Sequence, residues 1–236
     1  MLGQLNHWIL IAGTAADALL LLRILQLRLQ KTYTFITLAA LVTLFFDIVG
    51  LWLGLDSREN LYVILYSRFL LLFVFPAAAY DVWEEARPQI EPIRRFAGVR
   101  MIGSLAIASL FGLIIAAVTG SEEGRDTLLG TFAIIVWASA ATSSLAFLWS
   151  VRRLARAQNV ALPANTLVWL LYYKLLLAGE VVWCFLLITG EIINATALDS
   201  LQLVLNLYEI AVTLWCVWRL RSIASGVPTA PENVSS

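Results

Sequence analysis

Long apolar stretches separated by short polar segments form the main pattern along this chain. Seven of them reach the roughly 20 residues that a helix needs to cross a bilayer, and they lie at residues 5–27, 34–55, 60–83, 97–119, 127–151, 163–188 and 199–220. Polar or proline-containing segments separate the stretches, as at Asp56-Ser57-Arg58-Glu59-Asn60 and Arg87-Pro88. The pattern predicts an all-α polytopic integral membrane protein. A single seven-helix bundle would fill residues 1–222, and residues 223–236 would form a disordered cytoplasmic tail.

Composition supports this class and excludes others. Hydrophobic residues make up 61% of the 236 residues and charged residues 14%, whereas a soluble domain is roughly 45–50% apolar and 25% charged. Sixteen Lys and Arg residues balance sixteen Asp and Glu residues, so no basic excess is present to hold nucleic-acid phosphates. Membrane lipid is the expected surrounding partner, and the oligomeric state is left open.

The cations are distributed unevenly between the two sets of predicted loops. One set carries twelve: Arg23, Arg28, Lys31, Arg87, Arg94, Arg95, Arg100, Arg152, Arg153, Arg156, Arg219 and Arg221. The other set carries only Arg58 and Arg125. Because cytoplasmic loops are enriched in Lys and Arg, we predict that the N-terminus lies outside and the C-terminus in the cytoplasm. The excess of Arg over Lys favours a bacterial source, and hence the bacterial inner membrane.

Six ionisable side chains lie well inside the predicted spans, away from the ends of the helices: Asp17, Asp47, Arg68, Lys174, Glu180 and Glu209. Each costs roughly 2.5–3.5 kcal/mol at the centre of a membrane helix, and such residues usually face the interior of a bundle. At about 1.5 Å per residue, they lie roughly 12–18 Å below the outer ends of their helices, with Lys174 slightly deeper. The simplest arrangement is one acidic cavity that opens outward.

Polar stripes on three of the predicted helices indicate which faces would line such a cavity. Residues three and four apart are neighbours on a helix surface. The stripes are His7, Thr14 and Asp17 on the first helix, Thr43, Asp47, Gly50 and Gly54 on the second, and Gln202, Asn206, Glu209 and Thr213 on the seventh. Trp183 and Trp215 lie deep enough in their helices to join these residues. His7 is the one histidine of the chain, so neither a metal site nor a cofactor is predicted.

One stretch resembles a known family. Lys31-Thr32-Tyr33 follows the first predicted helix, and an apolar run leads from there to Asp47 in the second. This arrangement resembles the fungal-type membrane-bound terpene cyclases of indole-diterpene and meroterpenoid pathways, which also have seven helices and short loops. The resemblance implies that acids on the second and seventh helices, here Asp47 and Glu209, act as catalytic residues that protonate an isoprenoid substrate and start its cyclisation.

The chain departs from that family at both acids. The family usually has Asn-x-x-Trp-Glu on the second helix, where this chain has Thr43-Leu44-Phe45-Phe46-Asp47. On the seventh helix the family usually has Asp, where this chain has Glu209.

Three hypotheses follow, and whether the protein is an enzyme stays open among them. The first is an enzyme that protonates a membrane-soluble isoprenoid with Asp47 and Glu209. The second is a small carrier or sensor that binds a cation, a proton or a small solute. In both cases the binding residues would be Asp17, Arg68, Lys174, Glu180, Gln202, Asn206, Trp183 and Trp215. The third is a structural or accessory membrane protein whose buried charges only fix the packing of the helices.

Overall fold

The computed structural model describes residues 2–53, 58–86, 125–188 and 195–221. The described part of the chain is α-helical apart from short connections, and a 3-10 turn, η1, at Leu29–Lys31 joins the first two helices. The α-helices are α1 (Leu2–Gln26), α2 (Thr34–Leu53), α3 (Arg58–Ala86), α5 (Arg125–Ala157), α6 (Ala164–Ile188) and α7 (Ala195–Arg219). The all-α prediction is confirmed for these residues. The predicted span at 97–119 and the predicted tail at 223–236 lie outside the described residues.

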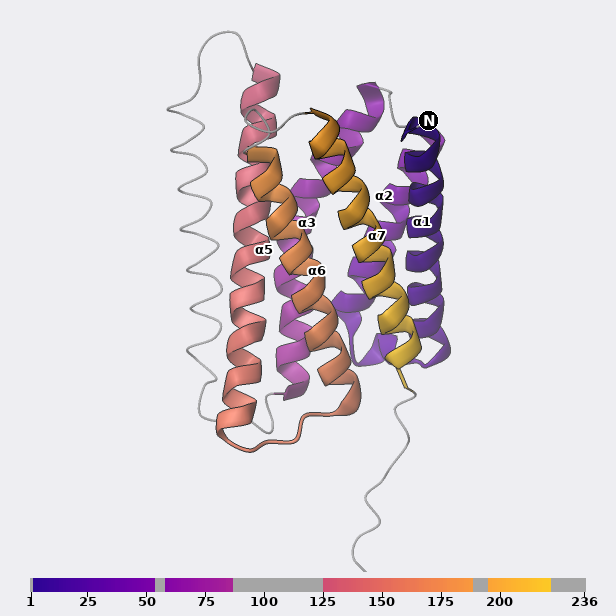
Figure 1. Ribbon diagram of the computed structural model, residues 1–236. Coiled ribbons are helices and arrows are strands. Elements are labelled where there is room, and N and C mark those ends of the chain that lie inside the picture. Colours follow the sequence, from indigo (N-terminus) through magenta and orange to yellow (C-terminus); the bar gives the residue numbers. More distant parts are fainter. Residues whose placement is uncertain (1, 54–57, 87–124, 189–194, 222–236) are drawn as a thin grey trace, which may run out of the picture.

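The described helices form a bundle in which each packs beside two neighbours. Going around the bundle, α1 contacts α2, α2 contacts α3, α3 contacts α5, α5 contacts α6, α6 contacts α7, and α7 returns to α1 (Figure 1). A further contact between α3 and α6 crosses the bundle. This contact divides the interior, so that α1, α2, α3, α6 and α7 surround one space and α5 lies outside it.

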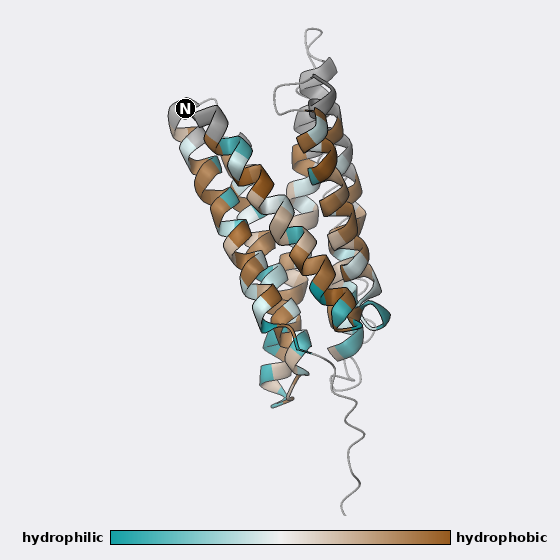
Figure 2. Cartoon of the chain, turned by 90° about the vertical axis from the view of Figure 1, so that its right-hand side faces the viewer, coloured by the Kyte–Doolittle hydropathy of each residue, from teal (hydrophilic) through white to brown (hydrophobic). Residues whose placement is uncertain are grey.

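Four of the described helices are long and apolar enough to cross a membrane, namely the segments Leu5–Gln26, Thr34–Leu53, Ala164–Leu186 and Ser200–Arg219. Hydrophobic residues, coloured brown in Figure 2, make up much of the helices, and many of the large apolar side chains are exposed. Trp8, Phe45, Trp52, Phe185 and Trp218 are each more than half exposed. A water-soluble protein rarely exposes apolar surface on this scale. The chain is therefore a multi-pass helical membrane protein.

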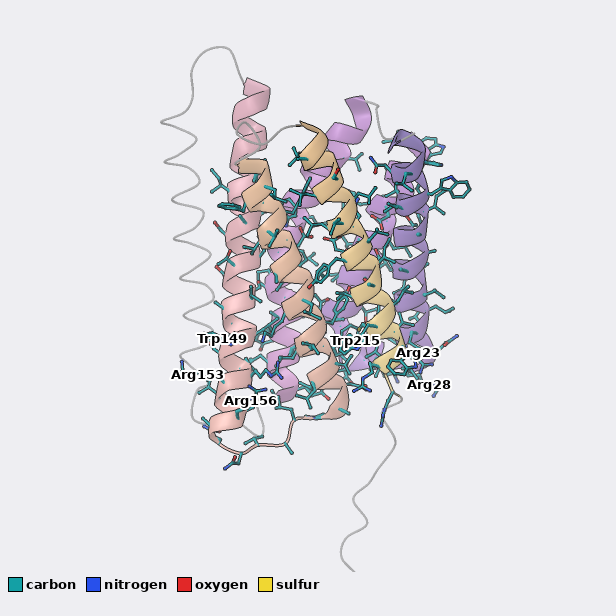
Figure 3. The ribbon with its side chains drawn as sticks, in the orientation of Figure 1. Arg23, Arg28, Trp149, Arg153, Arg156 and Trp215 are labelled. Atoms are coloured by element: carbon teal, nitrogen blue, oxygen red, sulfur yellow. The ribbon has the colours of Figure 1, made fainter. Side chains whose placement is uncertain are left out.

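The two ends of the bundle differ in charge and in packing. Arg23, Arg28, Arg153 and Arg156 lie at the same end (Figure 3), which we call the basic end. Here Arg23 donates a hydrogen bond from Nη2 to the Leu220 carbonyl oxygen over 3.0 Å. This hydrogen bond holds the end of α7 against α1.

Asn165 at the start of α6 holds the backbone just beyond α7. Its Nδ2 donates to the Arg221 carbonyl oxygen at 2.9 Å, and its Oδ1 accepts from the Arg221 backbone N–H at 3.1 Å. The last carbonyl groups of a helix have no partner within the helix. Asn165 thus satisfies backbone groups that would otherwise be left without partners at a partly buried site.

Two acidic residues of α3, Asp81 and Glu85, form hydrogen bonds to neighbouring helices near the basic end. The Asp81 side chain is 4% exposed, and its Oδ2 accepts a hydrogen bond from the Ile36 backbone N–H at 2.9 Å. Phe35 donates a second backbone hydrogen bond to the same carboxylate. Asp81 thereby caps the first turn of α2 from a different helix. Four residues further along α3, Glu85 accepts a hydrogen bond from the hydroxyl of Thr166 at the start of α6, at 2.7 Å.

Candidate functional site: an acidic cavity between the helices

A cavity of about 630 Å³ lies in the space surrounded by α1, α2, α3, α6 and α7. Small-molecule binding sites in proteins are commonly about 300–1,000 Å³. The cavity is therefore large enough for a ligand of drug-like or isoprenoid size. The ribbons in Figure 2 spread apart towards the end at which the chain begins and converge towards the basic end.

Most of the site residues predicted from the sequence line this one cavity. They are Asp17 on α1, Asp47 on α2, Glu180 and Trp183 on α6, and Gln202, Asn206 and Glu209 on α7. Their positions along the chain span more than 190 residues, so only the folding of the bundle brings them together. Four carboxyl groups thus reach the same space from four different helices.

Three of the four carboxyl groups, those of Asp17, Asp47 and Glu209, are close enough to interact. The side chains of Asp17 and Asp47 are joined by a hydrogen bond, and the charge of Glu209 acts on Asp17 as well. An ionised carboxylate can only accept hydrogen bonds, whereas a protonated carboxyl group can also donate one. A hydrogen bond between two carboxyl groups therefore requires a proton on one of them.

Neighbouring helices fix the position of Glu209. The preceding residue, Tyr208, donates a hydrogen bond from its hydroxyl to the Leu175 carbonyl oxygen of α6 at 3.0 Å. Its ring lies against Gly179, where an added Cβ would come within 3.2 Å of Tyr208 Cε1 and 4.0 Å of Glu209 Oε1. The missing side chain at Gly179 therefore lets α7 approach α6 closely enough to place the Glu209 carboxyl at the cavity.

Buried apolar and aromatic side chains close the cavity towards the basic end. Leu20, Ile36, Tyr172 and Tyr173 line it there, and each is at most 5% exposed. The indole ring of Trp169 packs behind them, with its centroid 5.8 Å from that of Tyr172. At the other end the lining includes the exposed side chain of Gln202. The cavity thus opens at the end away from the basic end.

The prediction that all six ionisable residues face one cavity is wrong for Lys174. This residue lies instead in a separate cleft with Trp149, Arg152, Arg153 and Arg156. Lys174 and Glu180 lie on different sides of α6, because a residue six positions from Glu180 points away from it on a 3.6-residue helix. Trp215 packs against the apolar core near the basic end and does not line the cavity. The side chain of Arg68 lies outside the described residues.

The described residues of the predicted stripes line the cavity on α2 and α7, but on α1 they do so only in part. Thr43, Asp47 and Gly50 of α2 all line the cavity, and so do the four predicted residues of α7; Gly54 lies outside the described residues. On α1 the cavity face runs through Asn6, Ile9, Gly13, Ala16 and Asp17. His7 is exposed and Thr14 donates a hydrogen bond to the Leu10 carbonyl oxygen. The first-helix stripe is therefore right at Asp17 and wrong at His7 and Thr14, because apolar and small residues form most of the face that lines the cavity.

Sequence reasoning missed two tyrosines of the cavity. Tyr172 and Tyr173 both line it from α6, and the hydroxyl of Tyr172 is hydrogen-bonded to that of Thr213 on α7. A pair of hydroxyl-bearing side chains in the middle of an apolar helix was the available signal. This signal is ambiguous, because tyrosine is also common near membrane surfaces. The capping role of Asp81 was not predicted either, although Asp81 lies near the end of the third predicted span.

Among the described residues, no group of three or more His, Cys, Asp and Glu side chains is arranged to hold a metal ion. Comparison of the chain with known protein families, characterised proteins and solved structures found no match. The cavity and its carboxyl groups are therefore the basis for any functional assignment.

Proposed function

We propose that the cavity is the active site of an enzyme that protonates a membrane-soluble isoprenoid and cyclises it. The observation that carries this proposal is the hydrogen bond between the carboxyl groups of Asp17 and Asp47 at the cavity. It keeps a proton at an aromatic-lined site that is large enough for a prenyl chain. The resemblance of residues 31–47 to membrane-bound terpene cyclases supports the same assignment, with Asp47 as the acid.

The reaction can be written with the groups of the cavity alone. Asp47 donates its proton to the oxygen of an epoxide, and the C–O bond breaks to give a hydroxyl group and a carbocation. The nearest double bond attacks the cation, which forms a ring and moves the charge along the chain. Glu209 then removes a proton beside the final cation, and this proton returns to the acidic pair through Asp17. The product is an isomer of the substrate, so no oxidant or reductant is needed.

The remaining lining suits a cationic intermediate. The faces of aromatic rings attract cations, by about 0.5–2 kcal/mol per contact, and Phe46, Tyr172 and Trp183 line the cavity. Lys174, which would repel a carbocation, lies in a different cleft. The closed apolar end of the cavity also keeps water from trapping the cation before the ring forms.

The test uses purified protein in liposomes supplied with epoxyfarnesol or epoxygeranylgeraniol, and product formation is followed by gas chromatography with mass spectrometry. The wild type is expected to form a cyclic product with the mass of the substrate. Asp47→Asn should lower the rate by about 10²–10⁴-fold, the usual contribution of a general acid. Glu84→Gln, which changes an exposed acid of α3, is the matched control and should leave the rate unchanged. Unchanged turnover in Asp47→Asn would refute the assignment.

A second candidate is a proton-coupled carrier or a sensor for a cation or small solute. The observation that favours it is the gathering of four carboxyl groups from four helices at a cavity with an exposed polar rim at Gln202. Liposomes under a pH gradient would then show uptake that fails in both Asp47→Asn and Glu209→Gln. A cyclic product without any such uptake would decide for the enzyme.

We further propose that the chain crosses the bacterial inner membrane seven times, with residues 97–119 as the remaining span and the basic end in the cytoplasm. The support is the ratio of twelve to two cations between the two sets of loops. A fluorescent protein that folds only in the cytoplasm should fluoresce when fused to the C-terminus and stay dark when fused to the N-terminus. The reverse result would overturn this orientation.

A further inference from the structure

The second cleft of the bundle carries a different chemistry from the acidic cavity. It measures about 300 Å³ and lies between α5 and α6. The residues that line it are Trp149, Arg152, Arg153, Arg156 and Lys174. Four of these five side chains are cationic and none is acidic, although the chain as a whole has no net charge.

Bringing these cations together is unfavourable without an anion. Arg152 and Arg156 are four residues apart on α5, where like charges are neighbours and repel each other. Lys174 reaches the same place from α6 and is repelled by both arginines. No hydrogen bond or ion pair joins these cations to any residue that the structure describes. A bound anion would relieve the repulsion.

The position of the cleft indicates where that anion comes from. Trp149, Arg153 and Arg156 lie at the basic end, at the same level as Arg23 and Arg28 (Figure 3). Lys174 lies about 15 Å along α6 from its start at Ala164, so its long side chain can extend from the apolar region towards the membrane surface. Tryptophan is enriched at this depth because its ring is amphipathic. The cleft therefore lies at the level of lipid headgroups.

We propose that this cleft binds a phosphate group, with the guanidinium groups of Arg152, Arg153 and Arg156 and the ammonium group of Lys174 as its ligands. One guanidinium group can bind two phosphate oxygens at the same time, and the lysine ammonium group adds a compact positive charge. Basic clefts between membrane helices suit the headgroups of anionic lipids. The phosphate belongs either to such a headgroup or to a soluble phosphate compound, and the site is independent of the acidic cavity.

The test measures binding of two probes to the purified full-length protein in detergent. One probe is dioctanoyl phosphatidylglycerol, counted as bound lipid by native mass spectrometry, and the other is inorganic pyrophosphate, measured by calorimetry. The cleft variant is the double substitution Arg153→Gln and Arg156→Gln, and both of these side chains are exposed. The matched control is Arg28→Gln with Lys31→Gln, which removes two exposed cations from the same end.

The proposal expects the dissociation constant of at least one probe to rise tenfold or more in the cleft variant and less than twofold in the control. If only lipid binding is lost in the cleft variant, the site binds a lipid headgroup. If pyrophosphate binding is lost, and pyrophosphate displaces the lipid from the wild type, the site binds a soluble phosphate compound. Equal losses in both variants, or no binding of either probe to the wild type, would overturn the proposal. Lys174→Gln should weaken binding, whereas Lys174→Arg, which keeps the positive charge, should bind as the wild type does. These two variants test the contribution of α6 to the site separately from that of the α5 arginines.

Discussion

The cap that Asp81 provides to α2 gives the sharpest test of how the basic end is stabilised. The side chain is 4% exposed, and it accepts hydrogen bonds from the backbone N–H groups of Ile36, at 2.9 Å, and Phe35. Ile36 is itself only 1% exposed, so water cannot readily replace the carboxylate. The substitution Asp81→Ala would therefore leave two N–H groups in the first turn of α2 without a partner.

The expected loss can be worked out from this geometry. A hydrogen bond to a charged group contributes about 1.5–3 kcal/mol, and loss of a helix N-terminal cap costs about 0.5–2 kcal/mol. Because both bonds share one acceptor and overlap with the capping effect, we expect Asp81→Ala to lower the free energy of unfolding by about 2–4 kcal/mol. Asp81→Asn keeps one acceptor oxygen but loses the charge, so its loss should be about 1–2 kcal/mol.

The measurement is reversible unfolding by a denaturing detergent, followed by circular dichroism, in matched mixed micelles. Glu84→Gln serves as the control, since it removes an exposed acid from the same helix three residues away, and its effect should stay within about 0.5 kcal/mol. A loss below about 0.5 kcal/mol in Asp81→Ala would show that this bond does not stabilise α2, and the reasoning would fail.

Three further predictions concern packing and catalysis. Thr166→Val removes the 2.7 Å hydrogen bond to Glu85 at a site with no exposure, and it should cost about 1.5–3 kcal/mol in the same unfolding assay; a neutral result would mean that Glu85 finds another partner. Gly179→Leu would force the Tyr208 ring away, because even a Cβ would lie 3.2 Å from it, and should cost about 1–3 kcal/mol. Gly13→Ala, whose Cβ would meet only Ile210 Cγ1 at 3.9 Å, is its control and should be neutral, so equal losses in the two variants would contradict the packing argument. Glu209→Gln should slow cyclisation in the liposome assay by about 10²-fold or more, and an unaltered rate would remove Glu209 from the proposed mechanism.

Sequence patterns alone predict the class of protein and all four acidic residues that line the cavity. Apolar stretches of membrane-spanning length can be recognised without any tertiary information, because the thickness of the bilayer sets the length of a helix. Carboxyl groups within such stretches are costly to expose to lipid, which is why Asp17, Asp47, Glu180 and Glu209 could be expected to turn inward together. The same argument succeeded for the stripes on α2 and α7, where polar residues recur at helical spacing.

Packing between the helices sets which of these charged groups lie together and which lie apart. Lys174 is as costly to expose to lipid as Glu180, but six residues of helical rotation turn it towards α5 and the arginines. No local pattern could show that Asp81 caps a helix 45 residues earlier in the chain, or that Asp17 and Asp47 lie within hydrogen-bonding distance. Such contacts depend on the order of the helices around the bundle and on the rotation of each about its axis. The order and the rotation of the helices are set by packing between residues far apart in the chain. The periodicity within one helix carries no information about that packing.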